Sequence, residues 1–343
     1  MNSLSAGASR IPAMKITVII PSYARPSDLR RCLSAVALQS RRPDEVLVIG
    51  REQDPGTWNV VSDLQKDFPV LRIVPVVEPG VIAALNCGLD NATGDVLVFT
   101  DDDAEAQVDW LERMEAGFAD QSIGAVGGRD WLQLPDEPAL FRPAQVSQVG
   151  VLTWYGKQHG NHHCPLRGHT GKVMFLKGVN MAFRRRALGS YRIDTSLHGR
   201  GAQAGYEMDL CFRIRQAGFD VFFDDRILVK HYCSPRKDGE GRNELNGSLF
   251  LDVNFNNQYV ITKNLGFWRA LAYFCNERLL GSHSTPGLLA CVKWHFKGDR
   301  QVWRRAVQMA GSGLAGFREG RQARALALQN RANLKFNCST GIE

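Results

Sequence analysis

Residues 98–104 read VFTDDDA, an apolar run that ends in three adjacent aspartates. Side chains alternate along an extended segment, so Asp101 and Asp103 are expected on one side and Asp102 on the other. Carboxylates this close repel one another and are costly to remove from water. The pair on one side therefore predicts a shared divalent cation, with a solvated acidic turn or a helix cap as the alternative.

The segments before this stretch alternate between two patterns. Continuous apolar runs that predict buried strands lie at 15–20, 45–50, 71–77 and 94–100. Apolar residues at helical spacing lie between them, at 25–39, where Ser27 is the expected N-cap, and at 56–68 and 80–93. Strands separated by helices in this way are typical of a parallel sheet covered on both faces. The sequence predicts an α/β, Rossmann-like αβα sandwich, whose ligands bind beyond the carboxyl ends of the strands.

The composition indicates a folded protein. The chain has 343 residues, of which 44% are apolar, enough for a large core. Polar or charged residues interrupt each apolar run before it reaches the roughly 18 residues that a membrane-spanning helix needs. Residues 1–14 are expected to be a flexible leader without a targeting signal. The cysteines stand singly, without the spacing of a zinc site or a disulfide framework, which favours reduced thiols and a cytoplasmic location.

Positive charge is concentrated in the last quarter of the chain. Residues 1–259 hold 29 Lys and Arg against 31 Asp and Glu, whereas residues 260–343 hold 13 against 4. The region 236–343 is expected to be a basic, amphipathic helical extension. Its aromatic and apolar stripes indicate core packing, or an interfacial surface for the anionic inner face of the cell membrane as the alternative. No recognisable nucleic-acid-binding module is present, so no nucleic-acid partner is expected.

Two further blocks carry residues suited to a site. KGVNMAFRR (177–185) places a Gly/Asn pair after an apolar run, which suggests a loop and a pocket wall formed by backbone, or an ordinary connection. A Gly-rich loop at 201–205 precedes a helix that begins with Glu207 and Asp209. The helix dipole alone favours acids at this position. Acids after a mobile loop also suit a general base that faces an acceptor hydroxyl.

Taken together, TVIIPSYARP, GVIAALNCGLDNATGDVLVFTDDDA, KGVNMAFRR, YEMDLCFRIRQAGFDVFF and KHYCSPR resemble glycosyltransferase family 2, over residues 15–235. The resemblance implies a GT-A fold, with residues 15–110 as the nucleotide-sugar-binding half and 111–235 as the acceptor-binding half. It also implies transfer of a sugar from a nucleotide-sugar donor to a hydroxyl group, with inversion at the anomeric carbon. Mg²⁺ or Mn²⁺ is the implied cofactor, bound by an Asp-x-Asp motif.

The resemblance assigns roles to individual residues. Asp103, Asp101 and His231 are the implied metal ligands, with the donor's ribose as the alternative partner of Asp101, and with a phosphate ligand or a surface histidine at a strand end as the alternatives for His231. The residues implied to contact the donor are Pro21, Ser22, Tyr23, Arg25, Asp101 and Asp102. A cation there would neutralise the charge that develops on the diphosphate leaving group.

The sequence departs from the family at two places. Where the family places the base, an aspartate that follows a glutamate, this chain has Glu207 after Tyr206. We expect Glu207 to be the catalytic base, with Asp209 as the alternative base or as a helper that binds acceptor hydroxyls. After the second strand, IGREQD replaces the aspartates that commonly contact the nucleobase, and Arg51 there is interpreted as a surface residue or as a contact for an acidic group.

The expected function is a metal-dependent, inverting glycosyltransferase that acts on a saccharide or a lipid-linked saccharide in the synthesis of cell-surface polysaccharide or glycolipid. A catalytically silent protein that binds sugar nucleotides or glycans is the alternative, motivated by the two departures. A nucleotidyltransferase would share the sheet and the acidic metal ligands. It normally needs a Gly-rich basic phosphate loop near the N-terminus, which PSYARPSD matches poorly.

Overall fold

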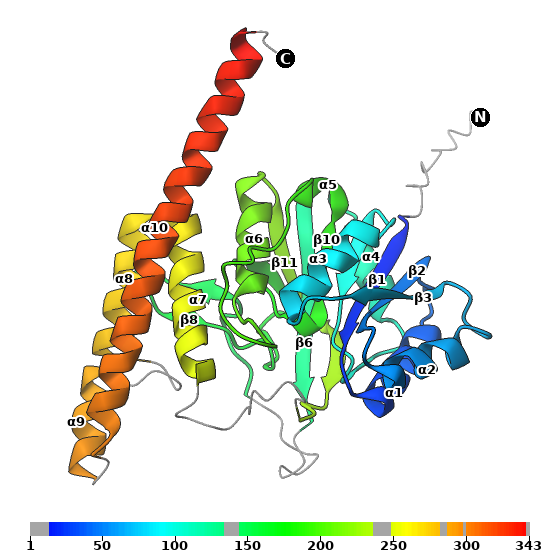
Figure 1. Cartoon of the computed structure of the whole chain (residues 1–343), viewed down its shortest axis with the longest axis horizontal. Helices are drawn as coiled ribbons and strands as arrows, with labels where there is room; N and C mark the ends of the chain where they lie inside the picture. The colour runs from blue at the N-terminus through cyan, green and yellow to red at the C-terminus, as the bar shows by residue number, and fades with distance from the viewer. Residues whose placement is uncertain (1–13, 134–143, 236–247, 282–286, 298–299, 341–343) are drawn as a thin grey trace, which may run out of the picture.

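The computed structural model describes residues 14–133, 144–235, 248–281, 287–297 and 300–340 (Figure 1). In the first hundred residues, strands and helices alternate as the apolar runs predict. The strands are β1 (Ile16–Ser22), β2 (Glu45–Arg51), β3 (Leu71–Val76) and β4 (Val96–Phe99), and they are parallel. The helices between them are α1 (Pro26–Ala37), α2 (Pro55–Leu64) and α3 (Val81–Asn91). The expected cap at Ser27 is wrong, because α1 begins one residue earlier, at Pro26, whose fixed φ suits the first turn of a helix.

The second half of the chain completes the same sheet. Its strand order is β3-β2-β1-β4-β10-β6-β11-β5, and β9 (Thr170–Val173) also pairs with β11. The added strands on this path are β10 (Met181–Arg184), β6 (Ile123–Leu132), β11 (Asp220–His231) and β5 (Ala104–Ala106). Strand β10 is antiparallel to β4 and β6, whereas β11 is parallel to β6. The carboxyl ends of β1, β4, β6 and β11 therefore meet at one edge, and Asp101–Asp103 follow β4 there.

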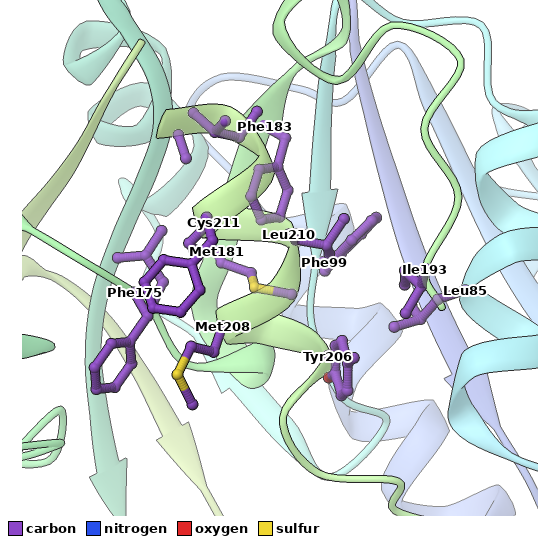
Figure 2. Packing of buried hydrophobic residues seen from close by; sticks show 14 of the residues in the cluster. Leu85, Phe99, Phe175, Met181, Phe183, Ile193, Tyr206, Met208, Leu210 and Cys211 are labelled. Atoms are coloured by element: carbon purple, nitrogen blue, oxygen red, sulfur yellow. The ribbon is translucent and has the colours of Figure 1, made fainter. Parts of the chain in front are cut away.

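Two apolar clusters cover the faces of the sheet. One lies under α1, α2 and α4 (Trp110–Gly117), and the other under α3 and α6 (Tyr206–Gln216). Figure 2 shows part of the second cluster, where Phe99 and Met181 from the central strands face Leu210 of α6. Burial of apolar area on both faces accounts for the continuous, non-alternating apolar strands of the sequence. Short elements at the periphery are β7 (Val151–Leu152), β8 (Gln158–His159), the 3₁₀ turn Gly178–Asn180 and α5 (Arg185–Leu188).

The C-terminal region is helical, as expected. Its elements are α7 (Ser248–Leu265), α8 (Phe267–Leu279), α9 (Leu288–Phe296) and α10 (Val302–Thr340), and α10 runs along α7 (Figure 1). Phe255, Tyr259 and Tyr273 are buried in the same apolar cluster as the sheet and α6. The helical extension therefore packs as part of the core and is not separate from it. Among the described residues, no helix combines the length and the apolar character needed to cross a membrane.

Candidate functional site

A cavity of about 1030 Å³ opens at the carboxyl edge of the sheet. It is bounded by the ends of β1, β2, β3, β6 and β11 and by the loop that precedes α6. Most of the residues expected to form the site line it: Pro21, Ser22, Tyr23, Arg25, Asp101, Glu207 and His231. The edge of an open α/β sheet is the usual position of a ligand site, and the cavity agrees with that rule.

Three potential metal ligands meet at the edge of this cavity: Asp101 and His231 line it, whereas Asp103 is almost fully buried and is not among the lining residues. Asp101, Asp103 and His231 each present a ligand atom, and these atoms lie within 4.8 Å of one another. Burial and the neighbouring charge of Asp103 raise the pKa of Asp101, so a bound cation would favour its charged form. Two carboxylates and one imidazole form a donor set that fits a divalent ion such as Mn²⁺. The grouping expected from the sequence is present in the fold, and these residues fit the metal.

His231 is oriented by a carboxylate that the sequence analysis missed. Its Nδ1 lies 3.0 Å from Oδ1 of Asp130, at the end of β6. Burial would lower the pKa of His231, but its contacts with Asp103 and Asp130 raise the pKa to about 12. The imidazole is therefore protonated without a cation, and a metal bound at Nε2 would displace that proton. Nε2 lies 3.3 Å from Oδ1 of Asp103 and has no partner with hydrogen-bond geometry among the described residues. Asp130 follows an apolar run, so the strand-end rule that selected Asp101–Asp103 could have found it.

Arg25 lies against the aspartates. Its guanidinium donates to Oδ2 of Asp103 at 2.9 Å and also pairs with Asp102. Ser22 donates to Asp102 at 2.9 Å. Burial of Asp102 raises its pKa to about 7, although Arg25 acts in the opposite direction. Arg25 therefore reduces the repulsion among the aspartates from within the protein.

Asp102 lies away from the cavity in which a donor would bind. Its side chain is fully buried, does not line the cavity, and contacts Ser22 and Arg25. This agrees with the alternation expected along an extended segment. Its pairing with Arg25 suits the structural role that the alternation gives the middle aspartate, and its contact with a donor stays a prediction.

Glu207 lies in the first turn of α6, where it lines the cavity. The backbone N–H of Gly205 donates to its Oε2 at 3.1 Å. The 3₁₀ turn at Gly178 packs directly against this helix start: a Cβ on residue 178 would come within 2.0 Å of Tyr206 Oη and 3.3 Å of Glu207 Cγ. Glycine is therefore required here for the close approach of the two segments. The GVNM block forms a wall of the cavity, as the sequence suggested.

Asn180, in the same block, fixes this wall to the sheet. It is fully buried, and its Nδ2 donates to the carbonyl oxygens of Arg129 at 3.0 Å and Ile227 at 2.9 Å. Its Oδ1 accepts a hydrogen bond from Trp110 Nε1 at 2.9 Å. A buried amide with its donors and acceptor satisfied in this way holds one geometry. The pairing of Gly178 with Asn180 thus positions the cavity wall without supplying a reactive group.

Asp209 is not in the cavity, and its assignment as an alternative base or an acceptor ligand is corrected. The side chain is fully buried between α6 and α7. Lys263 Nζ donates to it at 3.1 Å, Asn264 Nδ2 donates at 2.9 Å, and Tyr191 Oη also donates to it. A carboxylate paired in this way is a structural group that joins the helical extension to α6.

The same lysine pairs with Asp194, and this pair predicts a dependence of stability on pH. Lys263 Nζ lies 2.8 Å from Asp194 Oδ2. Burial would raise the pKa of Asp194, but Lys263 lowers it to about 2. Because the folded-state pKa lies below the unfolded value of about 3.9, the pair stabilises the fold above that value. The contribution of about 2 kcal/mol is lost as pH falls from about 4 to about 2.

Urea unfolding across this pH range, for the wild type and for Asp194→Asn, checks the expectation. The variant lacks the ion pair at every pH, whereas the wild type loses it on acidification. The free energies of unfolding of the two proteins should therefore differ near neutral pH and converge at low pH. Asp63→Asn is the control, because its ion pair with Arg30 is exposed and contributes little. Parallel curves for wild type and Asp194→Asn would contradict the assignment.

The loop at 198–205, which forms one side of the cavity, is held by α7. Asn256 of α7 is fully buried; its Oδ1 accepts from the backbone N–H of His198 at 2.7 Å, and its Nδ2 donates to the carbonyl oxygens of His198 at 2.8 Å and Ala204 at 2.9 Å. The His198 ring stacks on Phe255 with ring centroids 3.7 Å apart. Asn256 carries no motif in the sequence, so only the fold reveals that it fixes this loop.

Cationic side chains also line the cavity. Lys177 and Arg200 were not selected from the sequence: Lys177 stands at the start of the KGVNMAFRR block, which was read only as a wall formed by backbone, and Arg200 belongs to no motif. Arg51 lines the cavity with its guanidinium 5.6 Å from the Tyr23 ring, so it is a cavity residue and not only a surface residue. Cations at a site with several carboxylates suit a ligand that carries phosphate.

The strand order and the acidic edge of the sheet define the class of the fold, which is GT-A. The solved structure of the mannosyltransferase PcManGT from Pyrobaculum calidifontis, in complex with GDP-Man and Mn²⁺, superposes with a TM-score of 0.55 at 16% identity. The match covers 90% of this chain and 87% of that one, so the helical extension takes part in the similarity.

The family model "Glycosyltransferase like family 2" matches residues 12–245, and the chain belongs to this family. Glycosyltransferase AglE of Haloferax volcanii is 30% identical over 116 residues, which are 33% of this chain and 38% of AglE. Glucosyl-dolichyl phosphate glucuronosyltransferase of the same organism is 26% identical over 237 residues, which are 64% of this chain and 69% of that protein. The match thus spans well under half of AglE and about two thirds of the glucuronosyltransferase.

Proposed function

We propose that the protein is a metal-dependent, inverting glycosyltransferase. The observation that carries the proposal is that Asp101 and His231 line the same cavity as Glu207, and that a ligand atom of Asp103 lies within 4.8 Å of those of Asp101 and His231. A cation bound by the cluster would neutralise the negative charge that develops on the diphosphate leaving group of the donor. Pro21, Ser22 and Tyr23 of β1 and its following loop contact the base and ribose, and Arg25 assists in holding the anionic end of the donor.

Glu207 accepts the proton from the acceptor hydroxyl in this proposal. The oxygen of that hydroxyl forms the new bond to the anomeric carbon while the bond to the diphosphate oxygen breaks, and the nucleoside diphosphate leaves with the electron pair. Attack from the side opposite the leaving group gives inversion. The Gly205 N–H and the Gly178 wall hold Glu207 at the helix start, where a base can face the cavity.

The acceptor that we propose is a lipid-linked saccharide at the inner face of the cell membrane. The support comes from relatives, since one is named for transfer to glucosyl-dolichyl phosphate and another is a dolichol-phosphate mannosyltransferase. The basic helical extension is compatible with an anionic membrane surface. The product would enter a cell-surface polysaccharide or a glycolipid.

Incubating the protein with Mn²⁺ and a panel of UDP-, GDP- and dTDP-sugars tests the proposal. One of these donors is expected to raise the thermal midpoint in the presence of metal and to be slowly hydrolysed to the free sugar and the nucleoside diphosphate. Binding without hydrolysis would favour a silent binding protein instead. Release of pyrophosphate from a nucleoside triphosphate and a sugar phosphate would favour a nucleotidyltransferase.

A further inference from the structure

Helix α9 is apolar and yet is hardly covered by the rest of the protein. Its sequence is LLACVKWHF, in which Lys293 and His295 are the polar residues, and Cys291 is its one buried side chain. Phe296 is 85% exposed and Leu289 is 64% exposed. Burial of an apolar stripe is what normally stabilises a short amphipathic helix in a protein. An apolar helix left exposed in this way indicates a surface that is covered by something else.

The exposed apolar residues continue onto the adjoining ends of two neighbouring helices. We call this surface the α9 tip, and its exposed apolar side chains are Leu279, Leu280, Leu288, Leu289, Val292, Trp294, Phe296 and Trp303. Contacts with α8 and α10 hold α9 in place. Clusters of aromatic and aliphatic side chains of this kind suit the boundary between the lipid headgroups and the acyl chains.

Positive charge accompanies the apolar residues. Lys293, Lys297, Arg300 and Arg304 are exposed within or beside the α9 tip. In the sequence from 288 to 318, Asp299 is the only acid. Lysine and arginine side chains near an anionic bilayer surface are attracted by its negative potential and strengthen binding. A second copy of the chain would bring the same positive charges against these, so the charge pattern favours an anionic lipid surface over self-association.

The position of the α9 tip agrees with a membrane-bound acceptor. In Figure 1, α9 and the carboxyl ends of β1 and β6 point toward the same end of the molecule. The cavity opens at those strand ends. A bilayer that contacts α9 would therefore lie on the side from which an acceptor reaches Glu207.

We propose that the α9 tip inserts into the interfacial region of an anionic bilayer and that this surface is the membrane-docking site of the protein. The inference rests on the proposed function only in placing the acceptor in the membrane. Docking itself depends on the tip and not on the cavity residues.

Flotation with vesicles tests the proposal. The full chain is expected to float with vesicles of phosphatidylcholine mixed with phosphatidylglycerol, to float poorly with phosphatidylcholine alone, and to be released by high salt. The double variant Trp294→Ser/Phe296→Ser is expected to lower the partition coefficient at least about tenfold, because two large apolar side chains are lost. Lys293→Glu/Lys297→Glu is expected to lower it on the anionic vesicles in low salt.

Leu38→Ser/Val108→Ser is the matched control, since both residues are exposed and lie outside the tip, Leu38 directly after α1 and Val108 before α4. Its vesicle binding is expected to equal that of the wild type. Equal binding by the Trp294→Ser/Phe296→Ser variant, or no binding by the wild type, would overturn the proposal. A second outcome would also overturn it. If light scattering showed that the wild type is a dimer and the tip variant a monomer, and neither bound vesicles, the tip would be an interface between two copies of the chain.

Metal-dependent donor hydrolysis in solution without vesicles separates this inference from the proposed function. A tip variant that hydrolyses the donor as the wild type does is folded, so its loss of vesicle binding would support docking. A wild type that hydrolyses the donor but does not bind vesicles would leave the enzyme standing and reject the docking site. A wild type that binds vesicles through the tip without any hydrolysis would support the docking site and reject the enzyme.

Discussion

Asp103→Asn is expected to lower sugar transfer by about 10²–10³. Asp103 is one of the three clustered ligands and is almost fully buried, so the amide keeps the shape of the side chain and removes its charge. Affinity for Mn²⁺, measured by titration calorimetry, should fall together with turnover. The metal measurement matters because a loss of activity alone would not distinguish a ligand from a residue needed for folding.

Glu105→Gln is the matched control in the same segment. Glu105 pairs with Lys230 at 2.7 Å and accepts from Tyr232 at 2.7 Å, outside the cavity lining. Its removal should leave Mn²⁺ affinity and turnover close to the wild-type values. If Asp103→Asn bound Mn²⁺ as tightly as the wild type, Asp103 would not be a ligand and the cluster would have to be assigned differently.

Glu207→Gln is expected to lower turnover by about 10²–10⁴ while donor affinity and thermal stability stay near the wild-type values. The reason is that Glu207 faces the cavity, and the amide cannot accept the proton of the acceptor hydroxyl. Steady-state kinetics with a fixed acceptor, together with donor titration in the presence of Mn²⁺, separates the two effects. Unchanged turnover would exclude Glu207 as the base.

Asp209→Asn provides the contrast, because it lies two residues away on the same helix. It removes a fully buried charge that pairs with Lys263, so the main effect should be a loss of about 3 kcal/mol in the free energy of unfolding. Urea denaturation measures this loss. The two variants together distinguish the acid that faces the cavity from the acid that holds the helices together.

Much of the fold follows from the sequence because its strands are buried on both faces. The strands that end at Ser22, Arg51 and Phe99 are buried on both faces, mostly among apolar side chains, so pattern and structure agree. Their ends then fix where Asp101 and Asp103 lie. The metal cluster was predictable for the same reason, with His231 at the end of another strand.

The ion pairs made by the acidic and basic side chains around the site were harder to predict. Asp209 resembles Glu207 in sequence, and only the packing of α7 shows that Lys263 lies against it. Arg25 was expected to contact the donor, but its pairing with two aspartates depends on how the loop after β1 folds back toward β4. Long-range charge pairs of this kind are set by tertiary packing and leave no periodic signal in the chain.

The position of Asn256 determines how much of the chain is needed to keep the cavity intact. The family match ends at residue 245, so a builder of chimaeras would naturally cut there and exchange the helices that follow. The amide that holds the loop of the cavity lies beyond that cut, at residue 256. A chimaera that keeps residues 12–245 but lacks this asparagine would retain the proposed metal ligands and lose the support of the 198–205 loop, which leads into the helix that carries Glu207. The smallest transplantable unit of the protein therefore extends into its C-terminal helices.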